Sequence, residues 1–73
     1  MQIFKVRGLN GITVHVQANT QNQAIQRAQS PLIIREFTRL VQESLSQVTS
    51  VEPLRGSTHQ IRSLVFTDEF FNN

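Results

Sequence analysis

An alternation of apolar and polar residues on both sides of a glycine turn constrains the fold of this chain most strongly. Residues 2–8 and 12–18 both alternate, and residues 9–11 between them read Leu-Asn-Gly. Alternation over such lengths is typical of half-buried β-strands, and Asn-Gly is a strong hairpin signal. The sequence therefore predicts an N-terminal β-hairpin with one apolar face and one polar face.

The length of the turn decides the register of this hairpin. A two-residue loop would place charged side chains on the apolar face, because a shift of one residue moves every side chain to the other face. A three-residue loop avoids this, and it has a known geometry in which a type I turn is followed by a left-handed residue. Gly11 can occupy that position at little steric cost. The expected cross-strand pairs are Gly8–Ile12, Val6–Val14 and Phe4–Val16.

Two helices are expected after the hairpin. Thr20 and Gln23 have the spacing of a capping box, in which each residue's side chain satisfies a backbone amide of the other. This box predicts a short helix over residues 21–29. Pro31 suits the first position of a new helix, so a second helix is predicted over residues 31–46. The apolar stripe of the second helix consists of Ile33, Ile34, Phe37, Leu40, Val41 and Leu45.

The remainder of the chain is expected to return to β-structure. Residues 48–54 and 61–67 are predicted as the strands of a second hairpin, with a turn over 55–58 and a C-terminal tail over 68–73. The order strand, strand, helix, helix, strand, strand favours a single α+β domain over residues 1–67. Its small sheet is antiparallel or mixed, with one helical layer on one face. The other face is expected to meet solvent or a partner.

The first 28 residues resemble the start of ubiquitin. MQIF stands unchanged, and a glycine-closed hairpin and a helix follow in the same order. The resemblance implies a β-grasp-like fold, with a helix lying across a mixed sheet, as the alternative architecture. It also implies docking rather than conjugation, because the sequence ends FFNN and lacks the Gly-Gly carboxylate that activation requires.

Four segments, FKVRGL, ITV, NQAIQR and VTSVEPL, resemble pieces of the small linker domain of cyanobacterial phycobilisomes. The match requires a long insertion, and the paired glycines that this family has before its last strand are absent. The resemblance implies a non-catalytic linker that seats in the channel of a ring of pigment proteins.

Composition narrows the class of protein. The chain has 73 residues, the size of one domain with a thin core, and it contains no cysteine. The absence of cysteine excludes disulfides and thiolate catalysis, and it is compatible with a reducing compartment. No apolar run approaches the ~20 residues of a membrane span, and the start does not have the form of a signal peptide. We therefore expect a soluble, cytoplasmic protein.

Neither an enzyme nor a metal site is predicted. The sequence has no Gly-rich phosphate loop, no nucleophile elbow, and no serine or threonine with an obvious base. Its two histidines, His15 and His59, lack partners at metal-ligand spacing. A domain of this size also has little room for a water-excluding pocket of ~300 Å³ or more. We therefore expect no cofactor and no small-molecule substrate.

The outer side of the hairpin is the first candidate partner surface. In the expected register Lys5 faces His15 and Arg7 faces Thr13, and the first 35 residues hold four cations and no acid. Such a face suits an anion or a nucleic acid, and it is also the ordinary composition of a solvated sheet. Sheets that bind single-stranded RNA usually present aromatic side chains, and these outward positions hold none.

The C-terminal segment is the second candidate surface. Phe70 and Phe71 are adjacent, so they cannot both point inward from a regular strand. Either one folds back onto the core, or both form an apolar knob that docks into a partner or a second copy. Residues 61–67 would in addition offer an edge strand for self-pairing.

Two functions from different classes follow. The leading hypothesis is a non-catalytic adaptor domain that binds another protein, or a second copy of itself, through a sheet edge and Phe70-Phe71. The alternative is a weak nucleic-acid-binding regulator that uses Lys5, Arg7 and His15, with Arg27 or Arg35 assisting. Counterion release would make nucleic-acid binding fall steeply with salt.

Overall fold

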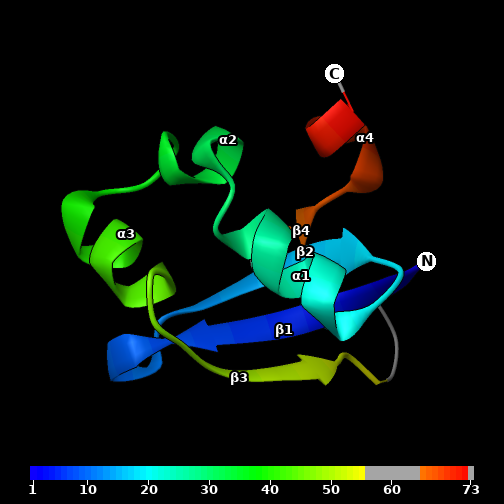
Figure 1. Cartoon of the computed structure of the whole chain (residues 1–73), viewed down its shortest axis with the longest axis horizontal. Helices are drawn as coiled ribbons and strands as arrows, with labels where there is room; N and C mark the ends of the chain where they lie inside the picture. The colour runs from blue at the N-terminus through cyan, green and yellow to red at the C-terminus, as the bar shows by residue number, and fades with distance from the viewer. Residues whose placement is uncertain (56–64, 73) are drawn as a thin grey trace.

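The computed structural model describes residues 1–55 and 65–72, and it places four strands in one sheet beneath a layer of helices (Figure 1). The strands are β1 (Gln2–Gly8), β2 (Thr13–Ala18), β3 (Val48–Pro53) and β4 (Val65–Phe66). Their order across the sheet is β3-β1-β2-β4. β1 pairs antiparallel with β2 and with β3, whereas β2 and β4 run parallel. The expected α+β class with a mixed sheet is confirmed.

The N-terminal hairpin has the predicted register. Phe4 lies opposite Val16, and the Gly8 N–H donates to the Ile12 carbonyl at 2.7 Å. This register sends the apolar alternate residues of both strands to the same side of the sheet. It is the arrangement expected if burial of the apolar face, rather than the tightest turn, decides the pairing.

The turn differs from the predicted one in a single residue. The segment η1 (Leu9–Gly11) is a tight turn in which Gly11 is left-handed as predicted, with φ 76°. Asn10 is left-handed too, with φ 64°, whereas a type I turn would keep it right-handed. Asparagine tolerates this region better than most residues because its short side chain bonds locally. The hairpin therefore uses two left-handed residues where one was expected.

The two C-terminal strands lie at opposite edges of the sheet, so the predicted second hairpin is wrong. β3 extends the sheet beyond β1, and β4 extends it beyond β2. Alternation in a strand indicates which face is buried, but it carries no information about which edge the strand joins. The predicted turn beyond Arg55, at residues 56–58, and the strand residues 61–64 lie outside the described residues.

The first helix, α1 (Gln21–Ala28), agrees with the prediction. The Thr20 hydroxyl accepts from the Gln23 N–H at 3.1 Å, which is the forward half of the capping box. The return half differs, because the Gln23 side-chain oxygen accepts from the Asn19 N–H at 2.7 Å rather than from Thr20. Both bonds satisfy amide donors at the helix start.

The predicted long helix is wrong, because it is broken into α2 (Pro31–Ile34) and α3 (Arg39–Leu45). Thr38 takes an extended conformation between them, with φ −65° and ψ 162°. The Gln42 side-chain amide donates to the carbonyls of Ile34 and Phe37, at 2.8 and 2.9 Å. These bonds satisfy backbone acceptors that a continuous helix would have used, so they stabilise the break.

The break determines which residues of the apolar stripe reach the core. Ile33 and Leu45 both have no exposed surface, and Phe37 and Val41 pack against the core from its margin. Leu40 is the exception, with 60% of its surface exposed, so its predicted place in the buried stripe is wrong. A bend between the two short helices lets residues from both ends of the segment enter a small core.

The residues after β4 form a short helix, α4 (Asp68–Asn72), rather than a simple tail. α1, α2, α3 and α4 all lie on one side of the sheet (Figure 1). The core fills the space between them and the strands. Its members among the described residues are Phe4, Val6, Val14, Val16, Ala18, Ala24, Ala28, Ile33, Leu45 and Phe66.

Gly8 allows α3 to approach the hairpin closely. A Cβ atom at Gly8 would collide with the backbone carbonyl and the hydroxyl of Ser44. Ser44 is 1% exposed, and its hydroxyl donates to the carbonyl of Leu9. The first turn of the sheet and the third helix are thus fixed to one another by a buried polar contact that has room only because residue 8 has no side chain.

Candidate partner-binding surface

The sheet face turned away from the helices carries the residues predicted as the first candidate surface. Lys5 and Arg7 alternate with the buried residues of β1, and Thr13 and His15 do the same on β2. Within the described part of the chain no helix covers this face (Figure 1). We call it the open face. It consists of Ile3, Lys5, Arg7, Thr13, His15, Gln17, Ser50, Glu52, Leu54 and Val65.

The strand register brings the four predicted residues together. Lys5 lies between His15 on β2 and Glu52 on β3, and Arg7 lies next to it between Thr13 and a β3 serine. Side chains directly opposite in neighbouring antiparallel strands have their Cβ atoms about 4.5–5.5 Å apart. The open face is therefore a continuous patch across three strands, and sequence reasoning missed the contribution of β3.

Burial and charge on the open face keep its histidine neutral. The pKa of His15 lies below its ordinary value of 6.5, first because burial disfavours the imidazolium and second because the Lys5 cation repels it. At neutral pH the positive charge of this face therefore comes from Lys5 and Arg7, not from the imidazole.

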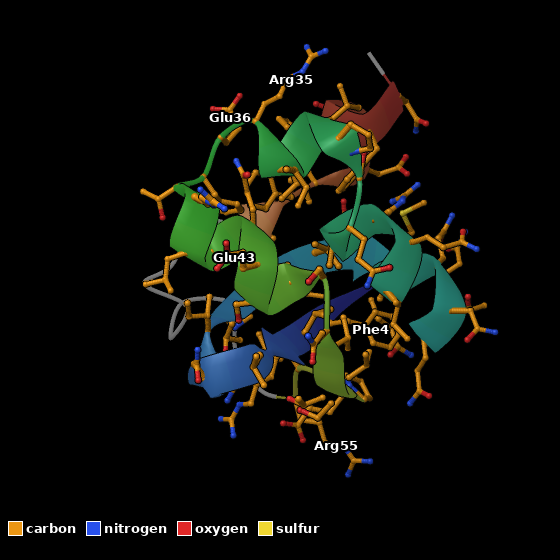
Figure 2. All side chains as sticks on the ribbon, turned by 60° about the vertical axis from the view of Figure 1, so that its left-hand side comes forward. Phe4, Arg35, Glu36, Glu43 and Arg55 are labelled. Carbon is orange, nitrogen blue, oxygen red and sulfur yellow. The ribbon has the colours of Figure 1, made fainter. Side chains whose placement is uncertain are left out.

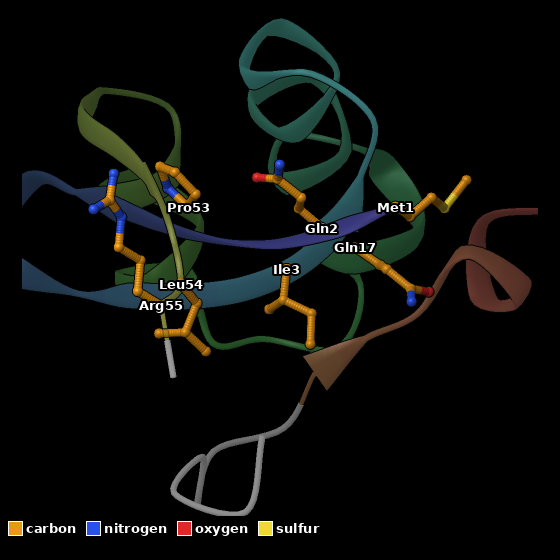
Figure 3. A pocket seen from close by; sticks show the side chains of 7 residues that line it. All are labelled: Met1, Gln2, Ile3, Gln17, Pro53, Leu54 and Arg55. Carbon is orange, nitrogen blue, oxygen red and sulfur yellow. The ribbon is translucent and has the colours of Figure 1, made fainter. Parts of the chain in front are cut away.

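A hollow of about 570 Å³ lies at one end of the open face and is only partly enclosed by the described residues (Figure 3). Ile3 and Leu54 point into it from neighbouring strands, joined by a 2.8 Å hydrogen bond from the Leu54 N–H to the Ile3 carbonyl. A second hollow of about 430 Å³ adjoins it and is lined by Lys5, Glu52 and Arg55 together with Pro53 and Leu54. The remaining residues around the first hollow are Met1, Gln2, Gln17, Pro53 and Arg55.

Charges are distributed unevenly between the two sides of the molecule. Among residues 1–55 and 65–72, Glu52 is the single acid of the open face, and Lys5, Arg7 and Arg55 form no ion pair. Arg55 projects from the side opposite to Arg35 (Figure 2). The other described acids belong to the helical layer, where they are Glu36, Glu43, Asp68 and Glu69.

The second candidate surface, Phe70 and Phe71, is packed against the protein's own core. Both side chains are half-buried, and their rings meet edge to face at a centroid distance of 5.4 Å. Phe66 contacts Phe70 at 5.0 Å and Phe37 at 5.7 Å, which extends the cluster into the core. Phe70 and Phe71 come from a helix, so neighbouring residues can share one buried side, which a strand would not allow.

Arg27, which the nucleic-acid hypothesis used as an assisting cation, is engaged inside the protein. Its guanidinium donates to the Gln17 carbonyl at 2.7 Å and to the Asp68 carboxylate at 2.8 Å, and it lies 4.8 Å from the Phe71 ring centre. The Arg27 side chain is 12% exposed. Its partner Asp68 lies 41 residues away, so no local pattern could have predicted the contact. Arg27 holds α4 in place and is not available to a ligand.

The other two arginines of the helical layer stay at its surface. Arg39 pairs with Glu43 at 3.0 Å, as its spacing predicts, with 91% of the arginine side chain exposed. Glu36 lies three residues before Arg39, a spacing that would allow a second pair in a continuous helix, but Thr38 interrupts the helix between them. Exposed pairs of this kind contribute little to stability.

The described residues contain neither a candidate metal site nor a candidate membrane span. No group of three or more His, Asp or Glu side chains in this part of the chain could hold a metal ion. No helix within it is long and apolar enough to cross a membrane. His59 lies outside the described residues.

No protein-family model matches this chain, and neither curated proteins nor solved structures give a significant match. The two resemblances in the sequence thus remain local ones.

Proposed function

We propose that this domain is a non-catalytic adaptor that binds another protein through the open face of its sheet. The observation that supports the proposal is the contrast between the two faces. One face is buried under helices, whereas the described residues of the other combine half-buried aliphatic side chains with cations that have no ion-pair partner. Protein interfaces combine an apolar centre with a polar rim, and arginine is enriched in them.

The open face is a better candidate than Phe70 and Phe71. Those two rings already pack in cis on Phe66 and on the core, and Arg27 covers Phe71. Using them as a docking knob would require α4 to detach and would expose apolar core surface to water. No described residue would have to move to free the open face, and partner surfaces usually change little on binding.

A capture experiment tests this proposal. Lys5→Glu/Arg7→Glu reverses two charges on the open face, and Arg35→Glu/Arg39→Glu makes the same charge change on the helical layer. All three proteins, wild type included, are immobilised and exposed to a lysate of the source cell, and bound protein and nucleic acid are both identified. We expect the wild type and the helical-layer variant to retain the same protein, and the open-face variant to lose it.

Two results would contradict the proposal. If the open-face variant retains the same protein as the wild type, the interface lies elsewhere. If the retained material is removed by nuclease and its retention falls steeply with salt, the open face binds nucleic acid instead. Circular dichroism of each variant establishes that the loss of binding is not a loss of fold.

A further inference from the structure

The hollow at the end of the open face indicates what kind of segment the partner presents. This step rests on the proposed function and goes beyond it. We propose that the partner's contacting segment is an acidic stretch with an aliphatic side chain. The aliphatic side chain seats between Ile3 and Leu54, and the neighbouring carboxylates face Lys5 and Arg55.

The apolar part of the site is built by β1 and by the residue that directly follows β3. Ile3 and Leu54 are both half-buried, and the hydrogen bond that joins their backbones holds them side by side. They form one wall of a hollow of about 570 Å³ (Figure 3). Volumes of about 300–1,000 Å³ accommodate a ligand of several side-chain groups. An open hollow of this size suits one aliphatic residue of a longer segment better than an enclosed small molecule.

The cationic part of the site adjoins the apolar part. Lys5 and Arg55 line the neighbouring hollow, and Arg55 also lines the first one. Within the described residues neither cation forms an ion pair, and the single carboxylate in this hollow belongs to Glu52. Two cations against one acid leave this end of the face net positive. Charge complementarity then favours a partner that brings carboxylates, which arginine binds with two parallel hydrogen bonds.

A second copy of the chain is a poorer occupant of this face. A symmetric dimer would place each open face against itself, and it would bring the unpaired cations of both copies together. The chain does contain an acidic and apolar segment of its own, Asp68-Glu69-Phe70-Phe71. That segment is docked in cis, with Asp68 paired to Arg27 and both phenylalanines half-buried. The occupant is therefore a segment of a different protein.

The experiment measures binding of the full-length protein to an immobilised library of short peptides with varied charge and aliphatic content. At physiological salt we expect the bound peptides to be enriched both in Asp and Glu and in Leu, Ile and Val. Enrichment for basic peptides, for uncharged polar peptides, or for no class at all would overturn the inference.

Matched substitutions assign the selected peptides to the site. Lys5→Glu/Arg55→Glu is expected to weaken the best peptide at least about tenfold, and Leu54→Ser to weaken it by a similar factor. Arg35→Glu/Arg39→Glu and Leu40→Ser make the same changes on the helical layer, where Leu40 is 60% exposed, and are expected to leave binding unchanged. Equal losses in the control variants would place the peptide elsewhere and overturn the inference.

A nucleic-acid probe distinguishes an acidic peptide from a nucleic acid as the ligand of the site. Single-stranded oligothymidine is titrated against the wild type under the same conditions, and it is expected to bind more weakly than the selected peptide. Oligothymidine binding as tight as the peptide, lost in Lys5→Glu/Arg55→Glu, would replace the inferred partner by nucleic acid. If the library shows no acidic preference while the lysate partner still depends on Lys5 and Arg7, this inference fails and the proposed function stands.

Discussion

Gly8 and Gly11 belong to the same hairpin, but the structure requires them for different reasons. Gly8 has no room for a side chain, because the backbone of Ser44 lies where a Cβ atom would be. Gly11 has open space around it and is constrained only by its φ of 76°, a backbone conformation that residues with a side chain rarely adopt. The first requirement is set by tertiary packing and the second by the turn. Sequence alone pointed only to the second.

This difference predicts that replacing alanine by asparagine reduces the loss of stability at position 11 and increases it at position 8. Gly11→Ala is expected to cost about 1–2 kcal/mol through backbone strain, and Gly11→Asn clearly less, because asparagine tolerates the left-handed region. Gly8→Ala is expected to cost about 1–3 kcal/mol or more through overpacking, and Gly8→Asn to be worse still. Urea unfolding of the four variants measures these free energies. A neutral Gly8→Ala would mean that α3 moves away from the hairpin at no cost.

His15 couples the open face to pH. Its pKa is lowered in the folded state, so the unfolded chain binds the proton more tightly. The neutral imidazole therefore supports full stability above its unfolded value of 6.5, and that contribution is lost as the pH falls from 6.5 through the folded pKa.

We expect the midpoint of thermal unfolding to fall as the pH is lowered from about 7.5 to about 5.5, above the range where most carboxylates titrate. His15→Gln removes the ionisation and should flatten this dependence. A slope in His15→Gln equal to that of the wild type would assign the effect to another group.

Among the elements, α4 depends most on contacts with the rest of the molecule. A helix of five residues is far too short to be stable alone. The Gln17 side chain accepts from the Asp68 N–H at 2.8 Å, and Arg27 binds both the Gln17 carbonyl and the Asp68 carboxylate. The C-terminal residues are helical because β2 and α1 supply these partners. Their sequence, predicted as a tail, contains none of that information.

Arg27→Met tests this account of α4. The substitution keeps much of the side-chain volume but leaves the Gln17 carbonyl and Asp68 without their donor, so we expect a loss of about 2 kcal/mol in unfolding free energy. Arg39→Met is the matched control. It removes an ion pair in which the arginine is 91% exposed, and it should cost less than about 0.5 kcal/mol. Equal costs for the two variants would show that Arg27 contributes no more than a surface charge.

Pro53 limits the addition of a further strand at the β3 edge of the sheet. Since Leu54 donates inward to Ile3, the alternation of the backbone turns the nitrogen of Pro53 outward, away from β1. Proline has no N–H to offer there, and proline is a common means of blocking an exposed edge. The β3 edge is therefore poorly suited to adding a further strand. This favours the open face over the sheet edge as the partner surface.

At the scale of the whole molecule, two layers separate the charges. Two acids of the helical layer form ion pairs with arginines, Arg27–Asp68 and Arg39–Glu43. The described cations of the open face lack such pairing. The described residues thus present one side that is close to neutral and one that is net positive, and the partner proposed above binds the positive side.

The sequence by itself determined the elements whose cause is local. Alternation and Gly11 specified the first hairpin and its register, and this placed Lys5, Arg7, Thr13 and His15 on one face. Thr20 specified the start of α1. These features depend on a residue and its near neighbours along the chain, so a pattern in the sequence is sufficient to predict them.

Only the tertiary structure decided the features that join distant residues. The break at Thr38, the helical form of α4 and the placement of β3 and β4 at opposite edges all depend on which partner satisfies a backbone group or fills the core. The open face is likewise completed by Glu52 and Leu54, which β3 brings beside β1. Periodicity in the sequence indicates which side of a strand or helix is buried. Which element packs against that side depends on the whole fold.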